Sequence, residues 1–235
     1  MAQIVSLTEQ YGLGSTRHGS VFEVLARSIA SQQLSGLVAG RILDRLVLAH
    51  DGRFPSPGQI VSARAEDLRA IGFSFAKIAA LKDLAAHSLD GRLPSDAELA
   101  LLDDEAVIGH CVAVRGIGRW TAQMLLMFHL GREDVLPVDD YGVRNGFRLA
   151  YGLKGLPRPK SLDRWGERWR PHRSAAAWYL WRAVDLKQQG LLPKRPGRSP
   201  RIEVVPASAP KKKKAKKKKT GKRHPSRRAT SARRR

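Results

Sequence analysis

The sequence predicts an all-α protein with a two-lobed helical domain over residues 1–190 and a disordered basic tail over residues 191–235. Apolar residues recur at helical spacing along nearly all of the first part. Turn pairs of the kind that join two alternating strands are not found there, so we expect no strands except near the N-terminus.

The positive charge of the chain is concentrated in the tail. The chain carries a formal net charge of +22, and residues 191–235 hold 19 of its 43 Lys and Arg but one of its 21 Asp and Glu. The tail has no large apolar residue after Val205 and cannot bury enough surface to offset its ordering entropy. Such a tail is expected to bind a polyanion, because each contact with a phosphate releases counterions and so favours binding. The alternatives are that the tail solubilises the protein, that it directs the protein to the nucleus or, less readily, that it binds an anionic membrane surface.

The expected helices follow from apolar spacing and from capping residues. The first runs from Val21 to Leu46 and is ended by the stretch 52–57, which contains one Gly and two Pro. Ser62 is the expected cap of a second helix that continues through Ile71, and Ser95 is the expected cap of a helix over 96–102. The remaining helices are expected around 78–84, 105–112, 120–130, 143–150, 162–169 and 174–189.

A glycine-containing turn, Gly116-Ile117-Gly118, lies between two of these helices. Glycine allows a backbone geometry and a close approach that a β-carbon would oppose. The turn would expose amide N–H groups at the start of the helix at Trp120, where the helix dipole also favours an anion. We therefore expect a phosphate-binding hairpin, with an ordinary helical corner as the alternative. The side chains expected to lock its two helices together are those of Val112, Val114 and Ile117.

Two adjacent carboxylates, Asp139 and Asp140, follow the hairpin by one helix and one loop. A phosphate-binding turn followed by a carboxylate suggests that the protein catalyses a reaction on DNA. Asp139 is expected to cap the helix at Tyr141 or to pair with an arginine. Metal binding through the two carboxylates is a weaker alternative, because no His or further acid lies near in the sequence.

Cys111 is the only cysteine, which excludes a disulfide within the chain, a four-Cys zinc site and a cysteine-ligated iron–sulfur cluster. Residues 1–20 lack the basic and apolar blocks of a signal peptide, and no apolar run reaches membrane-spanning length. We expect an intracellular, soluble protein that requires no cofactor and has no membrane partner.

The hairpin and the loop after it resemble a known superfamily. The stretch VRGIGRWTA at 114–122, followed by PVDDYGVR at 137–144, is similar to the helix-hairpin-helix (HhH-GPD) glycosylases, whose hallmark is this hairpin, a Gly/Pro-rich loop and a catalytic Asp. Three further stretches are similar to one branch, the DNA-3-methyladenine glycosylase II family. They lie at 29–35, 71–77 and 169–181.

The resemblance implies a DNA glycosylase with Asp140 as its catalytic carboxylate. Cleavage of an N-glycosidic bond develops oxocarbenium character on the deoxyribose, which an anion stabilises, and the same oxygen could orient or deprotonate the attacking water. A second acid is dispensable when the leaving base is already cationic, as an N-alkylated purine is. Relatives that also nick the strand carry a lysine at the position of Trp120, which forms a Schiff base with the sugar. Trp120 therefore implies removal of the base only.

The resemblance also implies an aromatic pocket for a flipped-out base, whose cationic form is attracted to electron-rich rings. The sequence departs from the family pattern at Met124, where a tyrosine is expected, and at His172, where tryptophan is common. The implied pocket residues are Trp120, Met124, Tyr141 and Trp181. The tryptophans expected only to pack the last helices are Trp165, Trp169 and Trp178.

Gln33 and Leu34 lie where the family inserts a side chain into the gap left by the flipped base. The alternative is that Leu34 belongs to the core and Gln33 to the polar surface. The residues expected to contact DNA are Gln33, Leu34, Gly116, Ile117, Gly118, Arg119, Thr121 and Arg144. The backbone carbonyls implied as a site for Na⁺ or K⁺ bridging to a phosphate are those of Val112, Val114 and Ile117.

Together these features predict a monofunctional DNA glycosylase that excises alkylated purines of the 3-methyladenine type by base flipping, in base-excision repair. We expect a monomer that binds double-stranded DNA with alkylated bases, and nonspecific DNA through the tail. It would be cytoplasmic and nucleoid-associated in a bacterium, or nuclear in a eukaryote. The alternatives are an architectural DNA-binding protein, which would need neither Asp140 nor the aromatic set, and a bifunctional glycosylase/lyase on oxidised bases, which Trp120 disfavours.

Overall fold

The computed structural model describes residues 1–8, 12, 19–192 and 200–205, and these residues form an all-α fold as predicted. In chain order the elements are α1 (Ala2–Ser6), α2 (Val21–Ser31), α3 (Gly36–Leu48), α4 (Pro57–Ser62), α5 (Ala65–Ile71), α6 (Phe75–Leu89), α7 (Asp96–Leu101), α8 (Asp104–Val112), α9 (Arg119–Met124), the π-helix η1 (Leu125–His129), α10 (Tyr141–Tyr151), β1 (Leu156–Pro157), α11 (Pro159–Gly166), the 3₁₀-helix η2 (Glu167–Trp169), α12 (Arg173–Gln188) and β2 (Val204–Val205). Within these residues, no helix is long and apolar enough to cross a membrane.

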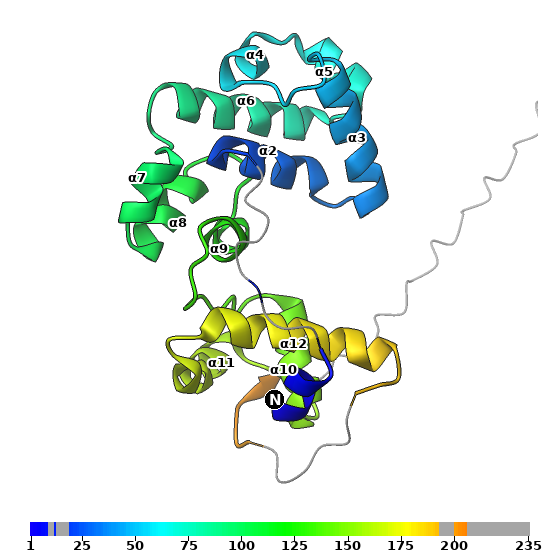
Figure 1. The fold of residues 1–235 in the computed structure, drawn as a ribbon, viewed down its shortest axis with the longest axis vertical. Helices are drawn as coiled ribbons and strands as arrows, with labels where there is room; N and C mark the ends of the chain where they lie inside the picture. The colour runs from blue at the N-terminus through cyan, green and yellow to red at the C-terminus, as the bar shows by residue number, and fades with distance from the viewer. Residues whose placement is uncertain (9–11, 13–18, 193–199, 206–235) are drawn as a thin grey trace, which may run out of the picture.

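The helices form two lobes (Figure 1). Helices α2 to α8 make one lobe, α10 to α12 with α1 make the other, and α9 lies between them. One continuous cluster of buried apolar side chains joins the lobes, from Ile29 and Leu81 on one side to Phe147, Leu162 and Leu180 on the other. The expected two-lobed helical domain is therefore confirmed.

The first expected helix, from Val21 to Leu46, is wrong, because the chain breaks into α2 and α3. Gln33, in the break, adopts a left-handed φ of 60°. The Ser35 side chain then accepts a hydrogen bond from the Val38 amide and starts a new helix. Leu34 continues the apolar spacing but is 39% exposed, so the spacing there did not mark a core residue.

Ser62 does not cap a helix, contrary to the prediction: it is the last residue of α4. That helix is started instead by Ser56, whose side chain and that of Gln59 form a reciprocal capping box, with Pro57 at the first position. Helix α5 begins after Arg64 without a side-chain cap. The sequence thus contains a complete set of start signals for this short helix, in Ser56, Pro57 and Gln59.

The expected cap at Ser95 is confirmed, and the helix expected over 120–130 occurs in a modified form. Ser95 forms a capping box with Glu98 at the start of α7. Helix α9 continues into the π-helix η1, in which the Leu130 amide donates to the Leu125 carbonyl, five residues back, at 3.0 Å. Apolar spacing alone does not distinguish this wider winding from an ordinary α-helix.

Glycines allow α10 to lie directly against α12. A β-carbon on Gly146 would overlap the backbone carbonyl of Leu180, and one on Gly142 would meet the ring of Trp181. The two glycines are four residues apart and share one face of α10. Their missing side chains bring Trp181 close to the start of α10.

A two-residue strand pair joins a distant part of the chain to this lobe. Leu156 and Pro157 pair antiparallel with Val205 and Val204. The Arg158 amide also donates to the Glu203 carbonyl at 2.9 Å. Strands were not expected here, and the folded part was expected to end near residue 190. Each of these strands exists only through its pairing with a segment far along the chain, which the local sequence does not show. The tail over residues 191–235 was expected to be disordered. Of these residues, 193–199 and 206–235 lie outside the part of the chain that the structure describes.

Cys111 is completely buried on α8. Burial raises the pKa of its thiol to about 11, because the charged thiolate is poorly solvated there. This side chain serves as a small apolar group in the core.

Candidate active site

Asp140 lies at the N-cap of α10, and three donors hold its carboxylate. The Val143 amide donates to Oδ1 at 2.6 Å, which caps the helix. The Trp181 indole donates to the same oxygen at 2.9 Å. The Trp120 indole donates to Oδ2 at 2.8 Å. The carboxylate is thus fixed in orientation, and Oδ2 accepts from one of these donors while Oδ1 accepts from two.

The two indole donors come from different elements. Trp120 lies in the first turn of α9, and Trp181 lies in the middle of α12. Gly142 provides the space for Trp181, since a β-carbon there would lie 2.7 Å from its Cδ1 and 3.0 Å from Asp140 Oδ1. The structure therefore brings together three residues that are separated by up to 61 positions in the sequence.

Several aromatic residues near this carboxylate are partly open to solvent. Trp120 is 50% exposed and Tyr141 is 67% exposed. Phe128, which sequence reasoning missed, stacks on Trp181 with ring centroids 6.0 Å apart and planes at 29°. Met124, expected in the pocket, is partly buried against the core. The site can therefore offer several ring faces beside one negative charge.

Two of the other tryptophans pack against a neighbouring helix, as expected. Trp165 and Trp169 meet the ring of Phe147 edge-on at 5.9 and 6.0 Å. The ring of Trp178 contacts that of Tyr179.

Asp139 has a different role from its neighbour. The expectation that Asp139 caps the helix at Tyr141 is wrong, because the capping side chain is that of Asp140. The Glu105 carboxylate forms an ion pair and hydrogen bonds with Arg119, and together with the nearby charge of Asp139 it raises the pKa of the Arg119 guanidinium. Arg119, expected to contact DNA, thus links the first turns of α8 and α9 in this structure.

The glycine hairpin between α8 and α9 is supported from the first lobe. Gly116 has a left-handed φ of 79°. Its carbonyl accepts a hydrogen bond from the Gln32 side chain at 2.9 Å, and the Arg115 amide donates to Asp83 Oδ2 at 2.7 Å. A β-carbon on Gly118 would meet no heavy atom within 4 Å, so the fold itself does not require glycine there. The space beside Gly118 is open to a ligand.

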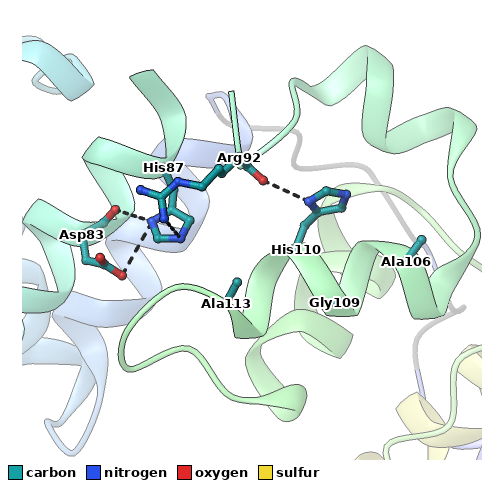
Figure 2. A pocket seen from close by; sticks show the side chains of 7 residues that line it. All are labelled: Asp83, His87, Arg92, Ala106, Gly109, His110 and Ala113. Atoms are coloured by element: carbon teal, nitrogen blue, oxygen red, sulfur yellow. Dashed lines mark hydrogen bonds and ion pairs between the residues drawn. The ribbon is translucent and has the colours of Figure 1, made fainter. Parts of the chain in front are cut away.

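Asp83 also belongs to a network that extends away from the hairpin (Figure 2). The buried His87 ring accepts a hydrogen bond from Arg92 at Nε2, at 2.9 Å, and its Nδ1 lies 2.9 Å from the Asp83 carbonyl. The Arg92 carbonyl in turn lies 2.9 Å from Nδ1 of His110. These groups line an open cavity of about 660 Å³. None of the predicted site residues lines it.

The loop at Gln33 and Leu34 projects from the first lobe. Both side chains are exposed, so the alternative that placed Leu34 in the core is wrong. Non-glycine residues rarely adopt the left-handed backbone of Gln33, which marks the loop as strained. Lys77 Nζ donates to the Ala30 carbonyl at 2.6 Å and so holds the end of α2, and burial lowers the pKa of this lysine.

Several of the expected residues make contacts within the protein itself. Thr121 is buried, with 6% of its surface exposed. Arg144 donates through Nε to the Pro157 carbonyl at 2.9 Å and thereby supports β1. Val114 and Ile117 are buried and lock the hairpin as expected, whereas Val112 is 43% exposed and does not.

Metal-binding side chains do not gather in the described part of the chain. No group of three or more His, Cys, Asp or Glu side chains there could hold a metal ion. The Val114 carbonyl, one of three implied for a monovalent cation, accepts a hydrogen bond from the Ile117 amide at 3.1 Å.

Comparison with known proteins places this site in context. Residues 26–171 match the model of the HhH-GPD superfamily of base excision DNA repair proteins. The chain is 40% identical to DNA-3-methyladenine glycosylase 1 of Schizosaccharomyces pombe over 166 residues, which cover 70% of this chain and 73% of that protein. It is 29% identical to DNA-3-methyladenine glycosylase 2 of Escherichia coli over 185 residues, or 72% of this chain and 62% of that protein.

A solved structure supports the same relation. The 3-methyladenine DNA glycosylase of S. pombe in complex with abasic DNA superposes with a TM-score of 0.71 at 37% identity, covering 79% of this chain and 91% of that one.

Two site features differ in how far the sequence could reveal them. Phe128 lies in the π-helix, whose winding apolar spacing does not reveal. Gly142 and Gly146 are a signal in the sequence, since two glycines four residues apart on one helix face permit close helix packing.

Proposed function

The chain belongs to the HhH-GPD superfamily of base excision DNA repair proteins, and we propose that it is a monofunctional DNA glycosylase that hydrolyses the N-glycosidic bond of alkylated purines such as 3-methyladenine. The observation that carries the proposal is the Asp140 carboxylate, oriented by two indole N–H groups and bordered by partly open aromatic rings. Attachment to DNA alone would require neither.

The chemistry follows from this arrangement. An alkylated purine flipped out of the duplex carries a positive charge, and the ring faces of Trp120 and Tyr141 attract it. As the bond to the base breaks, positive charge develops on the deoxyribose, and the Asp140 carboxylate stabilises it. Oδ2 keeps the capacity to accept a further hydrogen bond and so to orient the attacking water. Because Trp120 has no amine to form a Schiff base, the product is an abasic site in an uncut strand.

Other parts of the molecule bind the DNA. The amides of the hairpin around Gly118 bind a backbone phosphate of the lesion strand, and the exposed Gln33 and Leu34 fill the gap left by the flipped base. The carbonyls of Val112, Val114 and Ile117 would hold a monovalent cation, which would add positive charge beside the phosphate. We further propose that the protein acts as a monomer and that its basic tail adds sequence-independent affinity. It acts wherever the chromosome lies, in the nucleoid of a bacterium or the nucleus of a eukaryote.

Base release from methylated duplex DNA tests the function. The wild-type protein is expected to release free 3-methyladenine and to leave strands that break only on alkaline treatment. Asp140→Asn is expected to lower the release rate by at least about a hundredfold, since removal of a charge-stabilising group costs this much. The variant should fold, because an asparagine oxygen also caps a helix. Asp139→Asn is the matched control, and its release rate should stay close to that of the wild type.

Two outcomes would contradict the proposal. Binding of methylated DNA without release of any base would indicate an architectural DNA-binding protein. A covalent complex trapped by borohydride would indicate a lyase.

A further inference from the structure

Gln32 is a half-buried residue that links the exposed loop before α3 to the glycine hairpin. It follows the last residue of α2 and directly precedes Gln33. Its side-chain amide donates to the Gly116 carbonyl at 2.9 Å, across 84 positions of the sequence. Gly116 provides the left-handed turn of the hairpin. One side chain thus connects the loop proposed to enter the duplex with the turn proposed to bind a phosphate.

Helix α6 supports both of these segments. The Lys77 side chain donates to a carbonyl in the last turn of α2 at 2.6 Å. Ala80 lies against Gly116, where a β-carbon would come within 3.3 Å of the Ala80 β-carbon. Asp83 accepts a hydrogen bond from the Arg115 amide at 2.7 Å. The loop and the hairpin therefore rest on successive turns of one helix, and Gln32 adds a direct link between them.

The loop after Gln32 has a backbone that needs such support. Gln33 adopts a left-handed φ of 60°, which costs free energy in a residue with a side chain and persists only when its surroundings hold it. On the far side of this residue, the Leu34 amide donates to the Ser31 carbonyl at 3.1 Å and Ser35 caps α3. On the near side, the hydrogen bond of Gln32 fixes the preceding residue to the hairpin. The direction in which the loop projects is therefore set by the position of the hairpin.

We propose that Gln32 is a positioning residue that couples phosphate binding at the hairpin to insertion of Gln33 and Leu34 into the duplex. This inference rests on the proposed glycosylase function. When the hairpin binds the backbone of the lesion strand, the hydrogen bond to Gly116 holds the loop at a fixed distance from that backbone. A loop ordered in advance lowers the free energy of the flipped state, because it need not be ordered after the DNA has bound. Gln32 acts on base flipping and not on the reaction at Asp140.

Single-turnover release of 3-methyladenine from two duplexes tests the coupling. A strand with one adenine is methylated and annealed so that this base lies opposite either thymine or an abasic-site analogue. A base without a partner costs less to flip, so its release depends less on the inserted loop. Gln32→Met keeps the length of the side chain but removes the donor. Its release rate should fall about fivefold with the thymine duplex, the net effect of one hydrogen bond, and by no more than about twofold with the abasic duplex. Its affinity for undamaged duplex DNA should stay within about twofold of the wild type.

Gln32→Glu is a second variant, since its carboxylate oxygens cannot donate to the Gly116 carbonyl. At saturating protein it should show the same difference between the two duplexes. Gln188→Met is the matched control, because Gln188 is the exposed last residue of α12 in the other lobe. It should release the base from both duplexes at the wild-type rate. Thermal unfolding of each variant reports any general loss of structure.

Three results would overturn the assignment. An equal fall with both duplexes would show that Gln32 affects the reaction or the structure in general. Unchanged release from both would show that its hydrogen bond is not needed, and a loss of affinity for undamaged DNA as large as the fall in release would make Gln32 a DNA-binding residue only. Absence of 3-methyladenine release by the wild type would instead remove the proposed function itself.

Discussion

The two oxygens of Asp140 have different surroundings and therefore different tasks. Oδ1 accepts hydrogen bonds from the Val143 amide and the Trp181 indole, so it fixes both the start of α10 and the position of an aromatic ring. Oδ2 accepts from the Trp120 indole, whose side chain is itself half exposed, and so lies at the open part of the site. One residue thus joins the geometry of a helix terminus to the proposed chemistry of the reaction.

Gly142→Ala should impair catalysis more than folding. The new β-carbon would lie 2.7 Å from Cδ1 and 2.9 Å from Nε1 of Trp181, which must move and lose its hydrogen bond to Asp140. A hydrogen bond to a charged group contributes about 1.5–3 kcal/mol, so the single-turnover rate of base release should fall about tenfold or more. Unfolding should change little, because alanine favours the helix and a side chain can yield.

Gly40→Ala in α3 is the control, since nothing lies within 4 Å of its β-carbon position. It should retain full activity. An active Gly142→Ala variant would show that the position of Trp181 does not matter for the reaction.

At the scale of elements, the hairpin contains two glycines that serve different ends. Gly116 has a left-handed backbone, and a β-carbon there would lie 3.3 Å from that of Ala80. Gly118 has a φ of −100°, which any residue adopts, and free space around it. The fold needs the first glycine but not the second, which is therefore free to serve the proposed phosphate contact.

Gly116→Ala should lower the free energy of unfolding by roughly 1 kcal/mol or more, because alanine is strained at positive φ. Gly118→Ala should leave that free energy unchanged but weaken binding to duplex DNA several-fold, since its methyl group would oppose close approach of a phosphate. Denaturant unfolding and DNA titration measure the two effects. Equal affinity of Gly118→Ala and wild type would argue against phosphate binding at this turn.

The loop before Asp140 is tied to the start of α12. Arg173 donates to both carboxylate oxygens of Asp134, at 2.7 and 3.0 Å, and Arg170 donates to one of them at 2.6 Å. Ser174 accepts from the Val135 amide at 3.0 Å. This connection holds the chain that leads to Asp140 against the helix that carries Trp181.

The Asp134 clamp, formed by Asp134 with Arg170 and Arg173, should make stability depend on pH in the acid range. Burial tends to raise the pKa of Asp134, but the hydrogen bond from Arg173 and the charges of Arg173 and Arg170 outweigh it, so the pKa lies below its usual value. A lowered pKa contributes stability above the pKa of the unfolded chain, about 3.9, and the contribution is lost as pH falls through the folded-state value.

Asp134→Asn should therefore be destabilised at pH 7, by about 2 kcal/mol given the burial of Arg173, and should lose less stability than the wild type between pH 5 and about 2. Urea unfolding across this range gives both quantities. Parallel pH profiles for the two proteins would mean that the clamp contributes nothing.

At the scale of the whole molecule, the sequence predicted the helical class, the two lobes and the glycine turn between two helices, because these depend on periodicity and on a strong local pattern. It did not predict that Asp140, rather than Asp139, caps α10. It did not predict the break at Gln33, where apolar spacing runs on through an exposed Leu34. Nor did it predict the β1–β2 pair or the contact of Phe128 with Trp181, which depend on parts of the chain far apart in sequence.

The strand pair refines how the tail should be tested. Residues 206–235 contain fifteen Lys and Arg and no Asp or Glu, whereas residues 200–205 include β2 and belong to the fold. Deleting only 206–235 should weaken binding to undamaged duplex DNA and reduce the slope of log affinity against log salt concentration, by about 0.9 for each phosphate that the tail neutralises. Base release at saturating DNA should be unchanged. Identical binding of the two proteins across a salt series would rule out a DNA-binding role for the tail.

The burial of Cys111 has a consequence for the proposed repair of alkylated DNA, which would take place amid alkylating agents. A thiol is attacked by such electrophiles as its thiolate, and with a pKa of about 11 only about one molecule in ten thousand carries that form at pH 7. Burial thus protects the sole cysteine of the chain from the agents that produce the proposed DNA substrates. Intact-mass measurement after exposure to a methylating agent should show no adduct on Cys111 in the folded protein and one in urea; equal modification in both states would show that burial gives no protection.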